Sequence, residues 1–339
     1  MKKINYPKNV KNLYLKIFSA EELQTMQSDW ENTLNNNTYL KKEFPHSIID
    51  ILTGDFKMLT DIYFKYQKIL KNDATIKNTF IKYNGNTKYI FIFNYKDFYP
   101  KIINFFCKYS QKMNIHSCFY CDIQPVGKYT KKKNNPRLTL DLDHFYPKDQ
   151  CPILALSLKN FVPSCQVCNC RIKNKTPLLE LYKLDQIKDE KIIKQNLIKL
   201  SPTSNEYHFN KQTKIIVKPV PGFTKKGNFL KNIRAYRIKF LSNDIYKKEI
   251  KAFYLEQRYN SITILSEALS ILDLKQKFPR VRIKELKQIF DKTKYSVTEE
   301  DIEEIIFRKK YDENRHSNLL KMKKDLLESQ PPVKRVVCS

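Results

Sequence analysis

The chain has 339 residues, and 63 Lys+Arg against 35 Asp+Glu give it a formal net charge of +28. Hydrophobic residues make up 41% and aromatic residues 13%, so the chain can bury a core and is not a disordered polycation. Only 5 glycines occur, without any GxGxxG or Walker-type stretch, which argues against ATP hydrolysis or dinucleotide binding by this chain itself.

The excess positive charge predicts a polyanionic partner, with nucleic acid first and an acidic protein or an anionic membrane as alternatives. A lysine-biased, AT-rich genome is a further source of the same excess. The start, MKKINYPKNVKNLYLKIF, lacks the apolar stretch of a secretory signal, and no uncharged apolar run reaches about eighteen residues. We therefore expect a cytoplasmic protein that does not enter the membrane.

Residues 1–100 predict a mainly helical N-terminal region. Ser19 is an expected helix N-cap, because Glu22 follows three residues later as in a capping box. The stretch KYIFIFNY at 88–95 fits either a strand or a buried helical turn, since short apolar runs do not distinguish the two.

The composition changes over residues 101–180, where seven of the eight cysteines lie between Cys107 and Cys170. Beyond this core, residues 181–339 predict a β-hairpin from KQTKIIVKPV and RAYRIKFLS, which alternate as strands do. Helical periodicity follows, so the expected fold class is α+β. The expected helices occupy 244–275, 283–293, 299–310 after a Thr298 cap, and 317–329.

Four of the cysteines form two CxxC pairs, Cys118 with Cys121 and Cys165 with Cys168. Two intervening residues allow a tight knuckle to aim both thiolates at one tetrahedral ion, and two knuckles complete a structural zinc site. Four unrelated buried thiols are the alternative. The other cysteines lack a partner at metal spacing and are expected to be incidental thiols: Cys107, Cys151, Cys170 and Cys338.

The interval between the two pairs is 43 residues long and contains the polar residues of interest. It holds Asp143 beside His144, and Asn160 further on, while Asn169 directly follows the second pair. Asp141 shares a strand face with Asp143 by period two, which makes it a candidate support of a metal site. A bound zinc ion would clamp together the ends of this segment.

The pattern resembles the HNH endonuclease family, in the subset with a supporting zinc held by four cysteines. The resemblance covers about residues 115–178 and includes Pro147 and Leu158 at positions that suit the motif. Asn169 stands where the family name has its last histidine, a familiar variant. The core of the motif is Asp143-His144, Asn160, Cys165, Cys168, Asn169 and Lys173.

The resemblance implies a ββα-metal nuclease core at 101–180, embedded in mainly helical regions at 1–100 and 181–339. In that family the residue at His144 is the general base, and those at Asp143 and Asn169 bind catalytic Mg²⁺ or Mn²⁺. The residue at Asn160 braces the loop and orients the histidine. An amide oxygen at Asn169 suits a hard ion better than a transition metal.

The implied function is hydrolysis of phosphodiester bonds, with DNA ranked ahead of RNA. Anti-phage defence nucleases such as Septu-like nuclease subunits share this organisation and work beside an ATPase, so an ATPase partner is expected; restriction-like or mobile-element nucleases are rivals. The expected contacts to nucleic acid are Lys131, Lys132, Lys133, Lys148, Arg171 and Lys173.

Other interpretations remain open. A catalytically silent zinc module that binds nucleic acid, or a zinc-stabilised subunit of a larger complex, would use the same cysteines. His144 could be a core histidine or zinc ligand, Asp143 a cap and Asn169 a turn residue, while the nearby basic residues could form a solvated face. A thiol nucleophile at Cys151 lacks any supporting motif.

Overall fold

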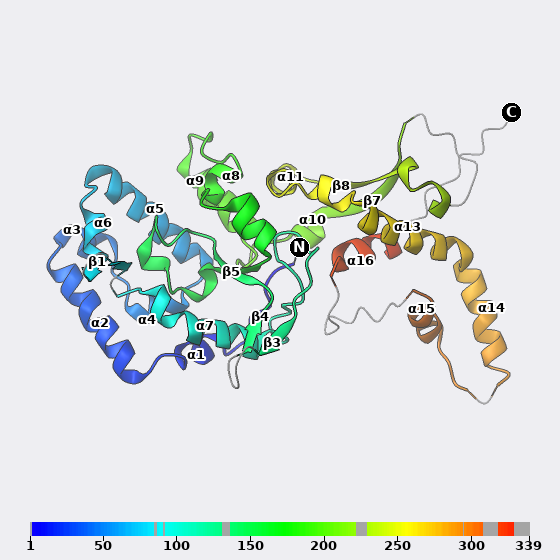
Figure 1. Ribbon diagram of the computed structural model, residues 1–339, viewed down its shortest axis with the longest axis horizontal. Coiled ribbons are helices and arrows are strands. Elements are labelled where there is room, and N and C mark those ends of the chain that lie inside the picture. Colours follow the sequence, from blue (N-terminus) through cyan, green and yellow to red (C-terminus); the bar gives the residue numbers. More distant parts are fainter. Residues whose placement is uncertain are drawn as a thin grey trace. The chain divides into compact units, whose positions relative to one another are not determined.

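The computed structural model describes residues 2–84, 87–90, 92–130, 136–221, 229–293, 295–307 and 318–328. These residues form helices and four two-stranded antiparallel sheets, compatible with the α+β class (Figure 1). The chain divides into two compact units, unit 1 (Met1–His208) and unit 2 (Phe209–Ser339). This division differs from the three predicted regions, whose boundaries near 100 and 180 both fall within unit 1.

The helices of unit 1 begin where side chains cap them. Ser19 and Ser47 each form a capping box with the acidic residue three positions later, and Asn37 and Asp55 accept hydrogen bonds from the first turns that they precede. The expected Ser19 cap is confirmed. The helices are α1 (Val10–Leu15), α2 (Ala20–Asn35), α3 (Thr38–Glu43), α4 (Ile48–Thr53), α5 (Phe56–Asn72), α6 (Ile76–Thr79), α7 (Tyr95–Tyr109), α8 (Leu178–Leu181) and α9 (Glu190–Leu200).

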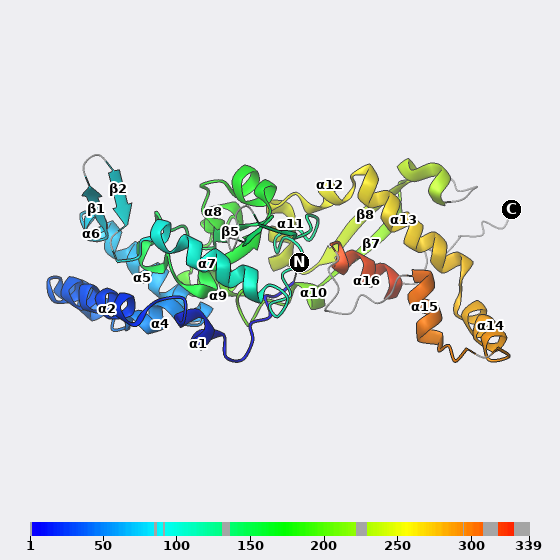
Figure 2. The same cartoon turned by 60° about the horizontal axis from the view of Figure 1, so that its bottom comes forward.

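Three short hairpins complete unit 1, and the first lies beside α6 (Figure 2). The ambiguous stretch 88–95 contains the end of a strand and, from Tyr95, the start of α7. A π-helix, Val167–Lys173, follows the last strand, and two 3₁₀ helices, Pro152–Leu154 and Leu158–Asn160, precede it. The strands are β1 (Ile81–Asn84), β2 (Thr87–Ile90), β3 (Lys128–Thr130), β4 (Pro136–Leu138), β5 (Asp141–His144) and β6 (Phe161–Ser164).

The N-terminal helices share one core with the cysteine-rich segment. The buried Tyr14 hydroxyl donates to the carbonyl of Leu156 over 2.7 Å. The Thr60 and Tyr146 hydroxyls are hydrogen-bonded at 2.8 Å, again within the core. Because these buried contacts join α1 and α5 to residues beyond 140, a boundary near residue 100 would cut through packed side chains.

Unit 2 contains the predicted hairpin, since β7 and β8 pair antiparallel from Thr213↔Ser242 to Pro219↔Tyr236. The long helix expected at 244–275 is instead three helices, because Tyr254 takes a left-handed conformation with φ 51°. The elements are α10 (Phe209–Gln212), β7 (Thr213–Pro219), a 3₁₀ helix (Phe229–Ala235), β8 (Tyr236–Ser242), α11 (Asp244–Ala252), α12 (Leu255–Tyr259), α13 (Ile262–Lys277), α14 (Arg280–Phe290), α15 (Glu299–Phe307) and α16 (Leu320–Glu328).

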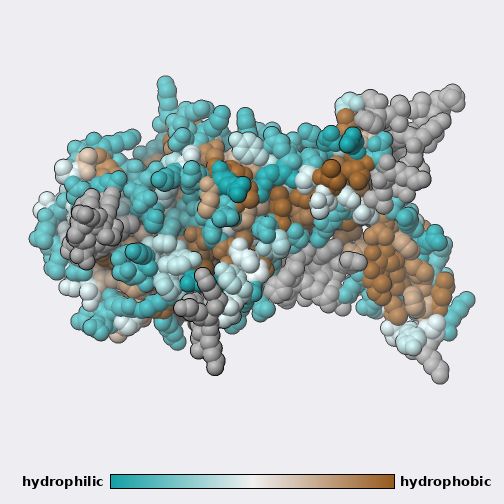
Figure 3. Space-filling view, viewed as in Figure 1, coloured by the Kyte–Doolittle hydropathy of each residue, from teal (hydrophilic) through white to brown (hydrophobic). Residues whose placement is uncertain are grey.

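Helix α16 packs against β7 and α13 in unit 2. The buried carboxylate of Asp325 accepts the backbone N–H of Ile215 at 2.6 Å and pairs with Lys321 at 2.6 Å. Helix α14 leaves Val281 and Ile289 exposed, and apolar surface is visible over α14 and α15 in Figure 3. Among the described residues, no helix has the length and apolarity needed to cross a bilayer.

Candidate metal and catalytic site

The four cysteines of the two CxxC pairs converge in the core of unit 1. Their sulfur atoms all lie within 4.8 Å of one another, and all four residues are buried. The Cys121 and Cys165 sulfurs are 3.9 Å apart, close to the edge of about 3.8 Å expected of a tetrahedron with Zn–S bonds of about 2.3 Å. The cluster therefore fits a structural metal ion such as zinc, as the spacing predicts.

Local backbone turns hold each thiol pair in place. The Asp122 N–H donates to the Cys118 carbonyl at 2.8 Å, and the left-handed φ of 57° at Asp122 turns the chain away after the first pair. In the second pair the Cys168 N–H approaches the Cys165 sulfur at 3.4 Å. The neighbouring thiols, Cys118 first, lower the pKa of Cys165 well below its ordinary value, which favours a thiolate.

Strands β5 and β6 connect this cluster to the Asp-His pair. They pair antiparallel, with Asp143 opposite Val162 and His144 opposite Phe161. Cys165 directly follows β6, and the Phe119 N–H in the first knuckle donates to the Pro163 carbonyl at 3.1 Å. The metal cluster thus anchors one end of the hairpin and the beginning of the π-helix.

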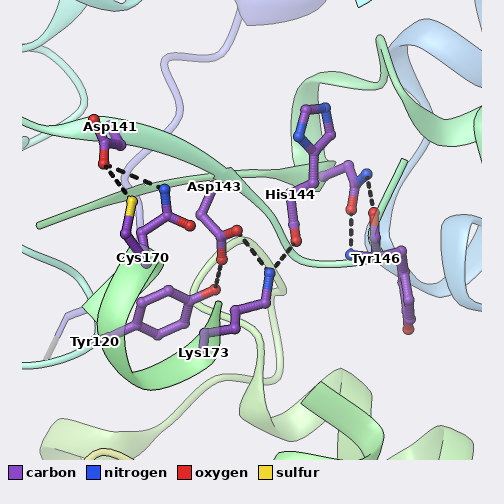
Figure 4. A network of polar contacts seen from close by, with 9 residues as sticks. Tyr120, Asp141, Asp143, His144, Tyr146, Cys170 and Lys173 are labelled. Carbon is purple, nitrogen blue, oxygen red and sulfur yellow. Dashed lines mark hydrogen bonds and ion pairs between the residues drawn. The ribbon is translucent and has the colours of Figure 1, made fainter. Parts of the chain in front are cut away.

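Asp143 lies in a buried polar network at the centre of Figure 4. Its side chain is 6% exposed, and Oδ1 accepts from the Lys173 ammonium at 2.6 Å, where Lys173 is only 3% exposed. The Tyr120 hydroxyl donates to Oδ2 at 2.8 Å, and Lys173 also donates to the His144 carbonyl at 2.7 Å. Burial raises the pKa of Asp143 above its ordinary value, while the Lys173 charge opposes that rise.

The His144 ring lies on the other side of β5 from the Asp143 carboxylate, as strand alternation requires (Figure 4). It is 9% exposed and packs edge-on against Tyr95 at 4.6 Å and beside Phe161 at 5.0 Å. Burial lowers its pKa from 6.5 to about 3, so the ring is neutral at pH 7. Because Nε2 faces the Ala155 carbonyl at 2.9 Å, it carries the proton and Nδ1 carries the lone pair.

Asn160 is fully buried and braces the loop after the Asp-His pair. Its side-chain oxygen accepts the Tyr146 N–H at 2.8 Å, and its amide nitrogen donates to the carbonyls of Tyr146 and Leu154 at 3.0 and 2.9 Å. Its own carbonyl accepts the Phe145 N–H at 2.8 Å. These bonds hold the backbone immediately after His144.

Asn169 lies on the π-helix and approaches Asp141 rather than Asp143 in the described contacts. Its amide nitrogen is 3.3 Å from Asp141 Oδ2, and the exposed Cys170 thiol lies 3.7 Å from the same oxygen (Figure 4). Asp141 and Asn169 are both partly exposed to solvent. A carboxylate and an amide suit a hard divalent ion, so Asp141 and Asn169 fit Mg²⁺ or Mn²⁺, whereas the buried Asp143, paired with Lys173, does not.

The predicted nucleic-acid contacts have different surroundings. Arg171 is exposed, and Lys148 is partly exposed and lies 3.8 Å from Asp149. Lys173 is buried in the ion pair, which differs from the solvent-facing phosphate contact predicted for it, because the Asp143 carboxylate draws the ammonium inward. The remaining three predicted contacts, Lys131, Lys132 and Lys133, lie outside the described residues.

Sequence reasoning missed the partners of Asp143 and Asn169. Tyr120 carries no signal beyond its place between the two cysteines of a knuckle, whereas Asp141 was indicated by its period-two spacing from Asp143. Compared with known proteins, the chain matches no family model, no curated protein and no solved structure.

Proposed function

We propose that unit 1 is a metal-dependent endonuclease of the HNH kind, which hydrolyses phosphodiester bonds of DNA and uses zinc only as a structural ion. The observation that carries the proposal is the assembly around the four-thiol cluster. A two-stranded hairpin and the helix after it bring Asp141, Asp143, His144 and Asn169 into one small region. A complete thiolate shell leaves zinc no open position for water.

His144 supplies the general base in this proposal. Its proton is on Nε2 facing Ala155, so Nδ1 can accept a proton from water, and the ring is neutral as a base must be. A bound Mg²⁺ or Mn²⁺ would neutralise charge on the scissile phosphate and the leaving oxygen. Tyr95 in the first turn of α7 covers the ring, so catalysis requires this turn to move aside.

The chain's charge supports nucleic acid as the substrate. A net charge of +28 attracts a polyanion without selecting a sequence, and Arg171 is exposed two residues from Asn169. DNA rather than RNA, an ATPase partner, and a role in anti-phage defence or restriction rest on the family resemblance. The neighbouring genes distinguish these contexts, since an ATPase favours a regulated defence effector and a methyltransferase favours restriction.

The test is plasmid nicking in Mg²⁺ or Mn²⁺ by wild type and by His144→Ala. We expect the variant to lose cleavage by about 10²–10⁴-fold, because it lacks the base while the lysines and arginines that bind phosphate remain. His208→Ala is the matched control, since it removes an exposed imidazole of the same unit. Zinc content and a gel shift on the same preparations verify fold and binding.

Equal nicking by wild type and His144→Ala would remove His144 from the catalytic centre. A second candidate function is a zinc-stabilised module that binds nucleic acid without cutting it. The burial of His144 and the Lys173–Asp143 pair favour this alternative, because both resemble a packed core. Wild type that shifts DNA but never nicks it, with or without a partner ATPase, would support the module.

A further inference from the structure

The Asp143 carboxylate already has a cation, the ammonium of Lys173. Its two oxygens accept hydrogen bonds from Lys173 at 2.6 Å and from Tyr120 at 2.8 Å. Lys173 is itself satisfied by the His144 carbonyl at 2.7 Å. A divalent ion bound to Asp143 would lie within a few ångströms of the ammonium, and this repulsion is strong where water is excluded.

Solvent access separates Asp143 from Asp141. Mg²⁺ and Mn²⁺ keep several water ligands when a protein holds them through one or two side chains, and a catalytic ion must also reach the substrate phosphate. Asp143 is 6% exposed and cannot offer room for these waters. Asp141, two residues earlier on the same face of β5, is partly exposed.

The second oxygen ligand lies next to Asp141. The Asn169 amide is 3.3 Å from Asp141 Oδ2, and a half-turn of the amide would direct its oxygen there. Asn169 is fixed by the thiol cluster, since its backbone N–H donates to the Cys165 carbonyl at 2.9 Å. The two side chains therefore meet on a framework that the structural metal holds rigid.

From this geometry we infer that the divalent ion of the proposed nuclease site binds Asp141 and Asn169, and that Lys173 is the permanent counter-ion of Asp143. The inference rests on the proposed function for the ion's role but not for its location. Lys173 then acts as a positioning residue, because it ties the π-helix to the carboxylate and to the backbone of His144.

The experiment is Mn²⁺ binding to the full chain without nucleic acid, followed by the EPR signal of free Mn²⁺. We expect Asp141→Asn to weaken binding by roughly tenfold or more, because it removes the only charged ligand. The double variant Asp143→Asn with Lys173→Met removes both buried charges together, and we expect it to bind as wild type does. Asp149→Asn is the matched control, since it deletes a surface carboxylate that is 79% exposed.

Trp30 fluorescence and zinc content show whether each variant is folded, because Trp30 is the single tryptophan and is buried in unit 1. Unchanged Mn²⁺ affinity in Asp141→Asn overturns the inference, even when the double variant fails to fold. Absence of Mn²⁺ binding by wild type at millimolar concentration overturns it as well. Mn²⁺ bound through Asp141 in a protein that cuts no DNA would refute the proposed function and leave the inference standing.

Discussion

Each unit contains one buried lysine–aspartate pair among its described residues, and the two pairs look alike at first. Lys173 and Asp143 in unit 1 are 2.6 Å apart with side chains 3% and 6% exposed. Lys321 and Asp325 in unit 2 are also 2.6 Å apart, with side chains 5% and 8% exposed. Burial raises the pKa of both carboxyls.

The two pairs differ in what holds them. Lys321 and Asp325 are four residues apart on α16, a spacing that brings any two helical side chains together, and Asp325 then ties α16 to β7 through Ile215. Lys173 and Asp143 are 30 residues apart and meet only because the thiol cluster holds β5 near the π-helix. The first pair follows from local structure, whereas the second depends on the metal site.

Cys165→Ser should separate the two units most strongly. A structural zinc ion supplies on the order of 10–16 kcal/mol of folding free energy in small zinc domains, so unit 1 should lose zinc and unfold. Unit 2 should keep its helical circular dichroism. The measurement combines zinc content with Trp30 fluorescence, and Cys170→Ser is the control because Cys170 is exposed and lies outside the cluster. A folded, zinc-free Cys165→Ser protein would contradict the structural role of the metal.

Lys173→Met and Lys321→Met test the two pairs directly. Each leaves a buried carboxylate unpaired, which typically costs about 3–5 kcal/mol of the free energy of unfolding. We expect Lys173→Met to shift the urea transition seen by Trp30 and Lys321→Met to leave it in place. Adding Asp143→Asn or Asp325→Asn, respectively, should recover part of the loss. Equal effects of both lysine variants on Trp30 would mean that the units do not unfold separately.

Acid should weaken unit 1 through His144, whose pKa burial lowers from 6.5 to about 3. The unfolded chain gains a proton as pH falls below 6.5 while the folded ring stays neutral, so stability is lost from pH 6.5 towards pH 3. At pH 5 the loss is about 2 kcal/mol.

The raised pKa of Asp143 acts with the opposite sign, since its contribution to stability is lost as pH rises. Comparison of wild type with His144→Gln therefore isolates the histidine. The difference between their unfolding free energies, measured by urea titration of Trp30 fluorescence at pH 7 and about pH 5, should change with pH. A constant difference would show that His144 titrates normally.

The smallest effect on stability is expected from the basic residues predicted to contact phosphate. Replacing Lys131, Lys132 and Lys133 with Ala should leave the unfolding transition unchanged. The slope of log K against log salt for duplex DNA should flatten by roughly 0.9 for each phosphate that the variant no longer neutralises. Lys173→Met should do the reverse, changing stability but not the slope, because its ammonium is buried. Filter-binding titrations at several salt concentrations measure both slopes.

Local signals in the sequence predicted much of the fold. Two-residue spacing predicted the thiol cluster, Ser19 with Glu22 predicted a cap, and alternation predicted β7 and β8. The same reasoning ran 244–275 as one helix, because nothing in the composition marks the left-handed Tyr254.

The candidate site was harder to predict because its contacts span distant segments. On a chain with 63 basic residues, nothing local distinguishes the buried Lys173 from its solvated neighbours. The π-helix also shifts side chains relative to α-helical spacing, so the face that Asn169 and Lys173 occupy could not be read from periodicity. The roles of His144, Asp143 and Asn169 in catalysis stay predictions.

The brace at Asn160 has a consequence for which residues its position tolerates. Its three side-chain partners are one N–H and two carbonyl oxygens, and only a primary amide offers one acceptor and two donors in a group of that size. Asn160→Asp would place carboxylate oxygen against two carbonyl oxygens, and Asn160→Gln would add a methylene to a fully buried space. The usual conservative exchanges are thus among the most disruptive here, and deamidation of this one side chain would inactivate an otherwise intact chain.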